Sequence, residues 1–169
     1  ICDDAHNFLL KNINNYDFIW SSPPCQSHSK MALANKRTPP KYPEMDLYQQ
    51  IIFLNHYCKN SWVVENVKPY YQPLIPPTKI IGRHYFWSNF NIKASDVSRP
   101  DNFINLQNST GKKLLQDWLG IHFSETLYYG ENHDPSQVLR NCVHPNLGKE
   151  IFNSYLNKNM PNQLQIKLG

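Results

Sequence analysis

The 169-residue sequence contains no run of 18 apolar residues, so no membrane-spanning helix is predicted. It has no initiator methionine and no basic or signal-like leader, and we therefore expect it to begin partway through a domain. Internal repeats and low-complexity tracts are also missing. Because 40% of the residues are hydrophobic and 13% aromatic, the sequence predicts one globular domain with its own core.

The spacings typical of metal sites and disulfide frameworks are missing as well. The four cysteines lie far apart, with no C-x-x-C pair: Cys2, Cys25, Cys58 and Cys142. This spacing argues against structural zinc, and no metal is expected. A chain of this length does not need disulfides to stabilise a core, and we interpret Cys2 and Cys58 as small buried hydrophobic residues.

Charge is present but gives a weak signal. The net charge is +4, with the basic excess concentrated in residues 59–99 and 137–169. Such a surface suits a phosphate-bearing partner, although an ordinary solvated surface has the same composition.

Hydrophobic periodicity predicts an α/β fold. The apolar run 17–22 and the run 61–66 are typical of buried strands. Between them, Leu47, Ile51, Leu54 and Cys58 have the spacing of a core-facing helix that starts near Pro43. This β-loop-α-β unit predicts parallel strands. Further elements are a helix within 3–15, an aromatic strand at 83–90, and helices at 112–119 and 147–156.

Cys25 follows the first strand in the segment Ser22-Pro23-Pro24-Cys25-Gln26. Two prolines end the strand and deliver the thiol just past its carboxyl end, where ligands bind in open α/β sheets. Glu65 and Asn66 lie at the end of the second strand, forty residues later. A thiolate can add to the electron-poor C6 of cytosine if an acid protonates N3, so this pair predicts an active site.

These motifs resemble those of the cytosine-5 DNA methyltransferases, in the form typical of the compact phage-type members. Pro23-Pro24-Cys25-Gln26 and Glu65-Asn66-Val67 are similar to the two central motifs, and Arg83 to the second arginine of a paired-arginine motif. Residues 139–148, with Asn141, Cys142, Pro145 and Gly148, are similar to the closing motif. The ordered set covers nearly the whole chain and is much more specific than any single motif.

The resemblance implies a Rossmann-like, S-adenosylmethionine-dependent methyltransferase fold with a mostly parallel sheet, and a reaction on flipped cytosine in double-stranded DNA. Cys25 would add to C6, Glu65 would assist at N3, and Arg83 would hold the base or a phosphate. Asp4, Pro24, Asn141 and Cys142 would contact S-adenosylmethionine. The residues implied to contact nucleic acid are Gln26, Ser27, Ser29, Lys30, Lys36, Arg37 and Asn66, the last also holding the local backbone.

The sequence departs from the family pattern at two points. Ile81 replaces the first arginine of the pair, and the glycine-rich strand-turn of the cofactor domain is missing, since the first glycine is Gly82. We therefore expect a fragment truncated at the amino terminus, or half of a split enzyme whose other part is a separate chain. The chain alone is expected to be inactive.

The expected division of the chain has three parts. Residues 1–90 would be catalytic, 91–136 a short target-recognition segment, and 137–169 the closing motif and a returning helix. The implied setting is the cytoplasm of a bacterial or phage-infected cell, in a restriction-modification context. Two alternatives stay open: a transfer RNA cytosine-5 methyltransferase and a non-catalytic DNA-binding remnant. We interpret His28 and His144 as hydrogen-bonding loop histidines, and the aromatic residues 85–87 as core.

Overall fold

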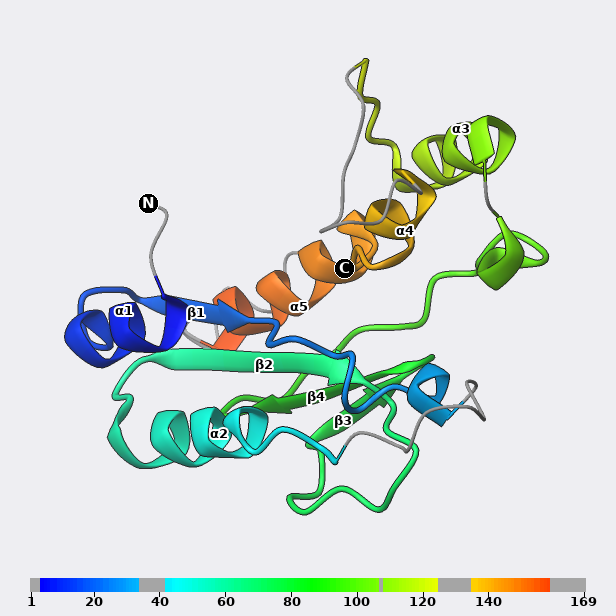
Figure 1. Cartoon of the computed structure of the whole chain (residues 1–169). Coiled ribbons are helices and arrows are strands. Elements are labelled where there is room, and N and C mark those ends of the chain that lie inside the picture. Colours follow the sequence, from blue (N-terminus) through cyan, green and yellow to red (C-terminus); the bar gives the residue numbers. More distant parts are fainter. Residues whose placement is uncertain (1–3, 34–41, 107, 125–134, 159–169) are drawn as a thin grey trace. The chain divides into compact units, whose positions relative to one another are not determined.

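The computed structural model describes residues 4–33, 42–106, 108–124 and 135–158 and has a mixed α/β fold (Figure 1). No helix in these ranges is both long and apolar enough to cross a bilayer. In chain order the elements are α1 (Ala5–Asn12), β1 (Phe18–Ser21), the 3-10 helix η1 (Lys30–Leu33), α2 (Asp46–Tyr57), β2 (Ser61–Val67), β3 (Lys79–Ile81), β4 (His84–Ser88), the 3-10 helix η2 (Phe103–Asn105), α3 (Asn108–Leu119), α4 (Pro135–Arg140) and α5 (Pro145–Lys158).

The described strands form one sheet in the order β1-β2-β4-β3. β1 and β2 are parallel, with Phe18 opposite Ser61 and Ser21 opposite Val64, as the β-loop-α-β pattern predicts. β4 is antiparallel both to β2 and to β3. The prediction of a mostly parallel sheet is therefore wrong, because one neighbouring pair of the described strands is parallel and two are antiparallel.

A tight hairpin is the physical reason for this difference. Only Gly82 and Arg83 connect β3 to β4, and a two-residue connection can join only antiparallel strands. Gly82 has a φ of 56°, in the left-handed region that a residue without a Cβ adopts at little cost. β4 then pairs with β2 in reverse direction, so β3 runs in the same direction as β1 and β2.

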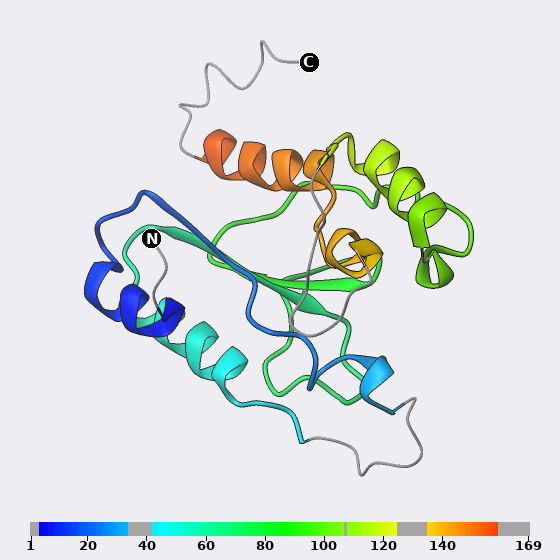
Figure 2. The same ribbon diagram turned by 45° about the horizontal axis from the view of Figure 1, so that its top comes forward.

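The core of the first compact unit, residues 1–93 and 154–169, lies between α2 and the sheet. Leu47, Ile51 and Leu54 are each 3% exposed or less, which confirms the predicted stripe. They pack in one cluster with Trp62 and Val64 of β2. Each such leucine or isoleucine contributes about 1.5–3 kcal/mol by leaving water. α1 lies beside α2, and His6 contacts Gln49 at 3.4 Å (Figures 1 and 2).

Aromatic rings fill another part of this unit. The Phe18 ring lies 4.9 Å from that of Tyr155 and 6.1 Å from that of Phe90. On β4, Tyr85, Phe86 and Trp87 are all buried, so the prediction that they belong to the core is confirmed.

The second compact unit comprises residues 94–153 and has its own apolar cluster. Phe103, Leu115, Leu119 and Leu139 form it. α3 ends at Leu119, and Gly120 follows with a φ of 67°, the helix stop that the sequence predicts. The division after residue 93 and before residue 154 places α5 in both units. A target-recognition role for residues 91–136 stays a prediction.

Candidate active site

Cys25 lies in a tight turn directly after β1. The backbone N–H groups of His28 and Ser29 both donate to the carbonyl oxygen of Cys25, at 3.1 and 2.9 Å, and close what we call the Cys25 turn, residues 25–29. The thiol is free and half-buried. Burial raises its pKa above the ordinary value, so this sulfur is protonated at neutral pH until a partner changes its surroundings.

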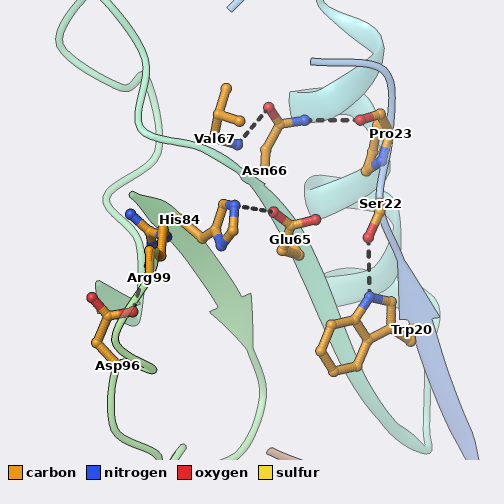
Figure 3. A network of polar contacts seen from close by, with 9 residues as sticks. All are labelled: Trp20, Ser22, Pro23, Glu65, Asn66, Val67, His84, Asp96 and Arg99. Atoms are coloured by element: carbon orange, nitrogen blue, oxygen red, sulfur yellow. Dashed lines mark hydrogen bonds and ion pairs between the residues drawn. The ribbon is translucent and has the colours of Figure 1, made fainter. Parts of the chain in front are cut away.

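Glu65 occupies an interior position of β2, opposite Phe86 of β4, and is only 7% exposed. Its burial raises the pKa of the carboxyl group, while the hydroxyl of Ser22 and the charge of Arg83 act in the opposite direction. His84 Nε2 lies 3.9 Å from Glu65 Oε1 (Figure 3). The site therefore holds a carboxyl group that retains its proton more readily than an exposed glutamate does.

The structure brings Cys25, Glu65 and Arg83 into one electrostatic cluster. After burial, the charge of Glu65 is the next cause that raises the pKa of Cys25, and the charge of Arg83 lowers it. Arg83 also lowers the pKa of Glu65. Such mutual effects require groups that are near one another, so the three residues predicted as catalytic are neighbours in this unit.

Asn66 joins the two strand ends. Its Nδ2 donates to the carbonyl oxygen of Pro23 at 3.0 Å, and its Oδ1 accepts from the N–H of Val67 at 2.9 Å (Figure 3). The side chain is 1% exposed. These bonds fit the expected role of holding the local backbone. A contact from Asn66 to nucleic acid stays a prediction, and its amide is already used within the chain.

Arg83 lies in the β3–β4 turn and is half-buried. Its carbonyl oxygen accepts a hydrogen bond from the N–H of Lys68 at 2.7 Å, which fixes the turn against the segment after β2. Ile81, in the place of the first arginine of the family motif, is 4% exposed and belongs to the core. Its position therefore supplies packing rather than charge.

The residues predicted to contact nucleic acid differ in exposure. Gln26 and Lys30 are exposed and Ser29 is half-buried. Ser27 is 2% exposed, and its hydroxyl accepts from the N–H of Glu44 at 3.2 Å, so its side chain serves the loop in this structure. Lys36 and Arg37 lie outside the described residues.

The residues predicted to contact the cofactor belong to different units. Asp4 and Pro24 are exposed in the first, whereas Asn141 is exposed and Cys142 half-buried in the second. Asp4 Oδ1 accepts from the N–H of Asn7 at 2.8 Å and caps α1, a role the sequence analysis missed. Cys142 Sγ donates to the carbonyl oxygen of Val138 at 3.4 Å. A shared site for S-adenosylmethionine at these four residues stays a prediction.

We compared the chain with protein-family models, curated proteins and solved structures. None of them matches. The functional argument therefore depends on the motifs and on the geometry described above.

Two histidines lie in or beside the site, and only one of them was predicted from the sequence. His84 was not predicted; its register opposite Val67 places it diagonally across from Glu65 on one face of the sheet, a relation visible only once β4 is known to pair with β2. His28 was predicted as a hydrogen-bonding histidine, and its Nδ1 indeed contacts the hydroxyl of Tyr71 at 2.5 Å. Unlike an ordinary loop residue, it is 1% exposed.

Proposed function

We propose that this chain carries the catalytic part of a cytosine-5 DNA methyltransferase, and that its sheet is part of a Rossmann-like methyltransferase domain. One observation carries the proposal: a free thiol in the turn after β1 and a buried carboxyl group with a raised pKa inside β2, the parallel neighbour of β1, lie near each other. The motif order in the sequence supports the same reading.

The reaction uses these two groups on one pyrimidine ring. Cys25 gives its thiol proton to water, and its Sγ forms a bond to C6 as the C5–C6 double bond opens, while the electron pair moves toward N3, which takes the proton of Glu65. C5 thereby becomes nucleophilic. S-adenosylmethionine, when bound, supplies the methyl group. Water takes the C5 proton, release of the Cys25 sulfur restores the C5–C6 double bond, and N3 returns its proton to Glu65.

The electrostatics of the cluster support this division of roles. A charged Glu65 raises the pKa of Cys25, so a protonated Glu65 leaves the thiol easier to ionise. The same proton is the one that N3 needs. Arg83 assists further because its positive charge lowers the pKa of Cys25. Burial favours the protonated form of the acid, and the charge of Arg83 favours the thiolate.

The cofactor needs protein beyond the residues that the structure describes. β1 is the edge strand of the described sheet, yet Phe18, Ile19 and Trp20 are apolar residues with no charge or proline among them, and all are half-buried. Natural edge strands are usually protected by charges, prolines or bulges. This composition supports the expectation that further strands, on a preceding segment or a separate chain, complete the sheet and the cofactor site.

Covalent trapping tests the proposal. The chain, expressed together with its upstream coding sequence, is mixed with S-adenosylmethionine and a DNA duplex that contains 5-fluorocytosine, whose fluorine cannot leave as the C5 proton does. We expect an adduct that survives denaturing electrophoresis with the native protein and with Cys58→Ala, the matched control. Cys25→Ala should give none.

Other outcomes of this experiment separate the alternatives. An adduct on a transfer RNA substrate but not on duplex DNA would favour the RNA enzyme. Duplex binding without any adduct, while S-adenosylmethionine is bound, would favour the non-catalytic remnant. An adduct that persists in Cys25→Ala would contradict the assignment of the nucleophile.

A further inference from the structure

A chain of hydrogen bonds leads from the backbone after β2 to His28 in the Cys25 turn. The N–H of Leu74 donates to the hydroxyl oxygen of Tyr48 at 3.2 Å. Tyr48 donates its hydroxyl hydrogen to Tyr71 at 3.1 Å. The Tyr71 hydroxyl and His28 Nδ1 lie 2.5 Å apart. All four residues belong to the first compact unit, and none of these contacts depends on the second.

The direction of this chain follows from its first donor. A backbone N–H can only donate, so the Tyr48 oxygen accepts and its hydrogen is available to Tyr71. Tyr71 accepts from Tyr48, so its own single hydrogen is available to His28 Nδ1, and a lowered pKa of the ring favours a neutral imidazole that can accept it. Nδ1 is then an acceptor, and the neutral ring carries its proton on Nε2.

The ionisation of the members agrees with this direction. Burial lowers the pKa of His28 by disfavouring the imidazolium, although the charge of Glu44 acts in the opposite direction. Burial raises the pKa of Tyr71, so its hydroxyl keeps its hydrogen at neutral pH. The imidazole is therefore neutral at neutral pH, and Tyr71 is a donor.

The backbone of His28 attaches the same turn to the same segment. Its N–H donates to the carbonyl oxygen of Cys25 at 3.1 Å, and its carbonyl oxygen accepts from the N–H of Tyr70 at 3.1 Å. Ser29 and Pro69 form a β-bridge beside it. Side chain and backbone thus join the turn that carries the thiol to the segment that follows Glu65 and Asn66.

The one group of His28 that the chain does not use is Nε2, which is buried and has no hydrogen-bond partner among the described residues. An unpaired buried donor costs stability, so a histidine at this place is not the choice that stability alone would make. The unpaired Nε2 of His28 therefore needs an explanation other than stability, and a role in the site is one.

From this geometry we propose that His28 is a positioning residue for Cys25, held as the Nε2–H tautomer by the chain Leu74–Tyr48–Tyr71. The proposal rests on the proposed function only in calling Cys25 the nucleophile. The tautomer and the link between Tyr71 and the thiol are properties of this chain alone, and they can be measured without DNA or cofactor.

The experiment compares Tyr71→Phe, Tyr48→Phe and the control Tyr57→Phe, which removes an exposed hydroxyl from the same helix as Tyr48. Two quantities are measured on the full chain: the His28 tautomer, by nitrogen-15 NMR of the histidine rings, and the rate at which iodoacetamide alkylates Cys25, by peptide mass spectrometry. Cys58 provides an internal reference for alkylation.

In the native chain and in Tyr57→Phe we expect the Nε2–H tautomer and the same slow alkylation of Cys25. Tyr71→Phe should mix the tautomers and speed the alkylation of Cys25 by roughly two- to tenfold, the equivalent of one net hydrogen bond, without changing Cys58. Tyr48→Phe should act in the same direction but less strongly, because it leaves the Tyr71–His28 bond in place.

Two results would overturn the proposal. One is an Nδ1–H tautomer in the native chain, which would reverse the direction of the hydrogen bonds. The other is alkylation of Cys25 in Tyr71→Phe at the native rate. That result would show that the Tyr71–His28 hydrogen bond does not affect the reactivity of the Cys25 thiol. Failure of the methylation proposal would instead appear as missing adducts on 5-fluorocytosine with both of these measurements unchanged.

Discussion

The position of Glu65 in a buried strand determines the pKa of its carboxyl group. It follows Val63 and Val64, which are fully buried, and shares their environment at 7% exposure. A charged carboxylate in such a place is expensive, and the nitrogen of His84, at 3.9 Å, is too far for a hydrogen bond that would compensate it. Burial therefore favours the protonated carboxyl group of Glu65, which is the form that can donate a proton to an acceptor nitrogen.

This reasoning predicts a pH dependence of stability. Burial raises the folded-state pKa of Glu65 above its ordinary value of 4.5, so the folded chain binds this proton more tightly than the unfolded chain does. The resulting stability is fully present below the ordinary pKa and is lost as pH rises through the folded pKa. Glu65→Gln removes this loss, because its amide does not titrate.

We therefore expect the free energy of unfolding of the native chain to fall relative to that of Glu65→Gln as pH rises from the ordinary pKa of 4.5 through the raised folded pKa. Urea unfolding at several pH values measures the difference. Glu44→Gln, at an exposed position before α2, is the control and should change this difference much less. A constant difference between the native chain and Glu65→Gln would show that Glu65 titrates at an ordinary pKa.

Single residues of the site were predictable where a motif marks them and not where a contact creates them. Cys25 and Glu65 stand at the ends of apolar runs, and their proximity follows from parallel neighbouring strands. His84 could not be found in this way, because its place beside Glu65 depends on the register of an antiparallel pair. Tyr48 and Tyr71 meet His28 across long sequence separations, which periodicity does not report.

At the scale of elements, two hydrogen bonds connect the segment after β1 with the end of β2 and the segment that follows it. Asn66 provides one through its bond to the Pro23 carbonyl, and His28 provides the other through Tyr71. Both connect the segments that carry the thiol and the acid. The distance between these groups is thus set by side chains that take no part in the chemistry.

Asn66→Ala should weaken this connection measurably. The substitution leaves the Pro23 carbonyl and the Val67 N–H without their present partner in a buried place, so we expect a loss of about 1–3 kcal/mol in the free energy of unfolding. Asn55→Ala, at an exposed position of α2, should stay within about 0.5 kcal/mol of the native chain. Equal effects of the two substitutions in urea unfolding would refute the link.

Elements were predictable in proportion to their length and periodicity. α2 and β2 were found because apolar residues repeat over many positions, and the stripe of α2 is buried as expected. β3 has three residues directly after a proline-rich segment, and α4 has six, so neither gives a pattern that stands out. Missing β3 also hid the hairpin, and with it the reversed direction of β4.

For the whole molecule, the open edge of β1 is the feature with the widest effect. Beside it lies a groove of about 490 Å³ lined by residues of α1, β1 and the connection between them, with Gln50 from α2. No residue of α1 is buried in the described structure. An apolar strand left half-exposed at the edge of a sheet is a surface that further strands can cover.

We accordingly expect residues 1–169 alone to bind S-adenosylmethionine weakly and to show no turnover. Titration calorimetry of S-adenosylmethionine into this chain should give no saturable heat at micromolar concentrations. A micromolar dissociation constant for residues 1–169 alone would contradict the expectation. Circular dichroism of the same sample checks that the chain is folded.

The two-residue connection that holds Arg83 behaves as a fixed-length spacer. Because β3 and β4 are both hydrogen-bonded within the sheet, the backbone of Arg83 is held in a short turn between two fixed strands. Lengthening that connection by one amino acid would turn alternate side chains to the opposite face and move the cation away from the thiol. The length of one turn therefore sets where this cation lies relative to Cys25 and Glu65.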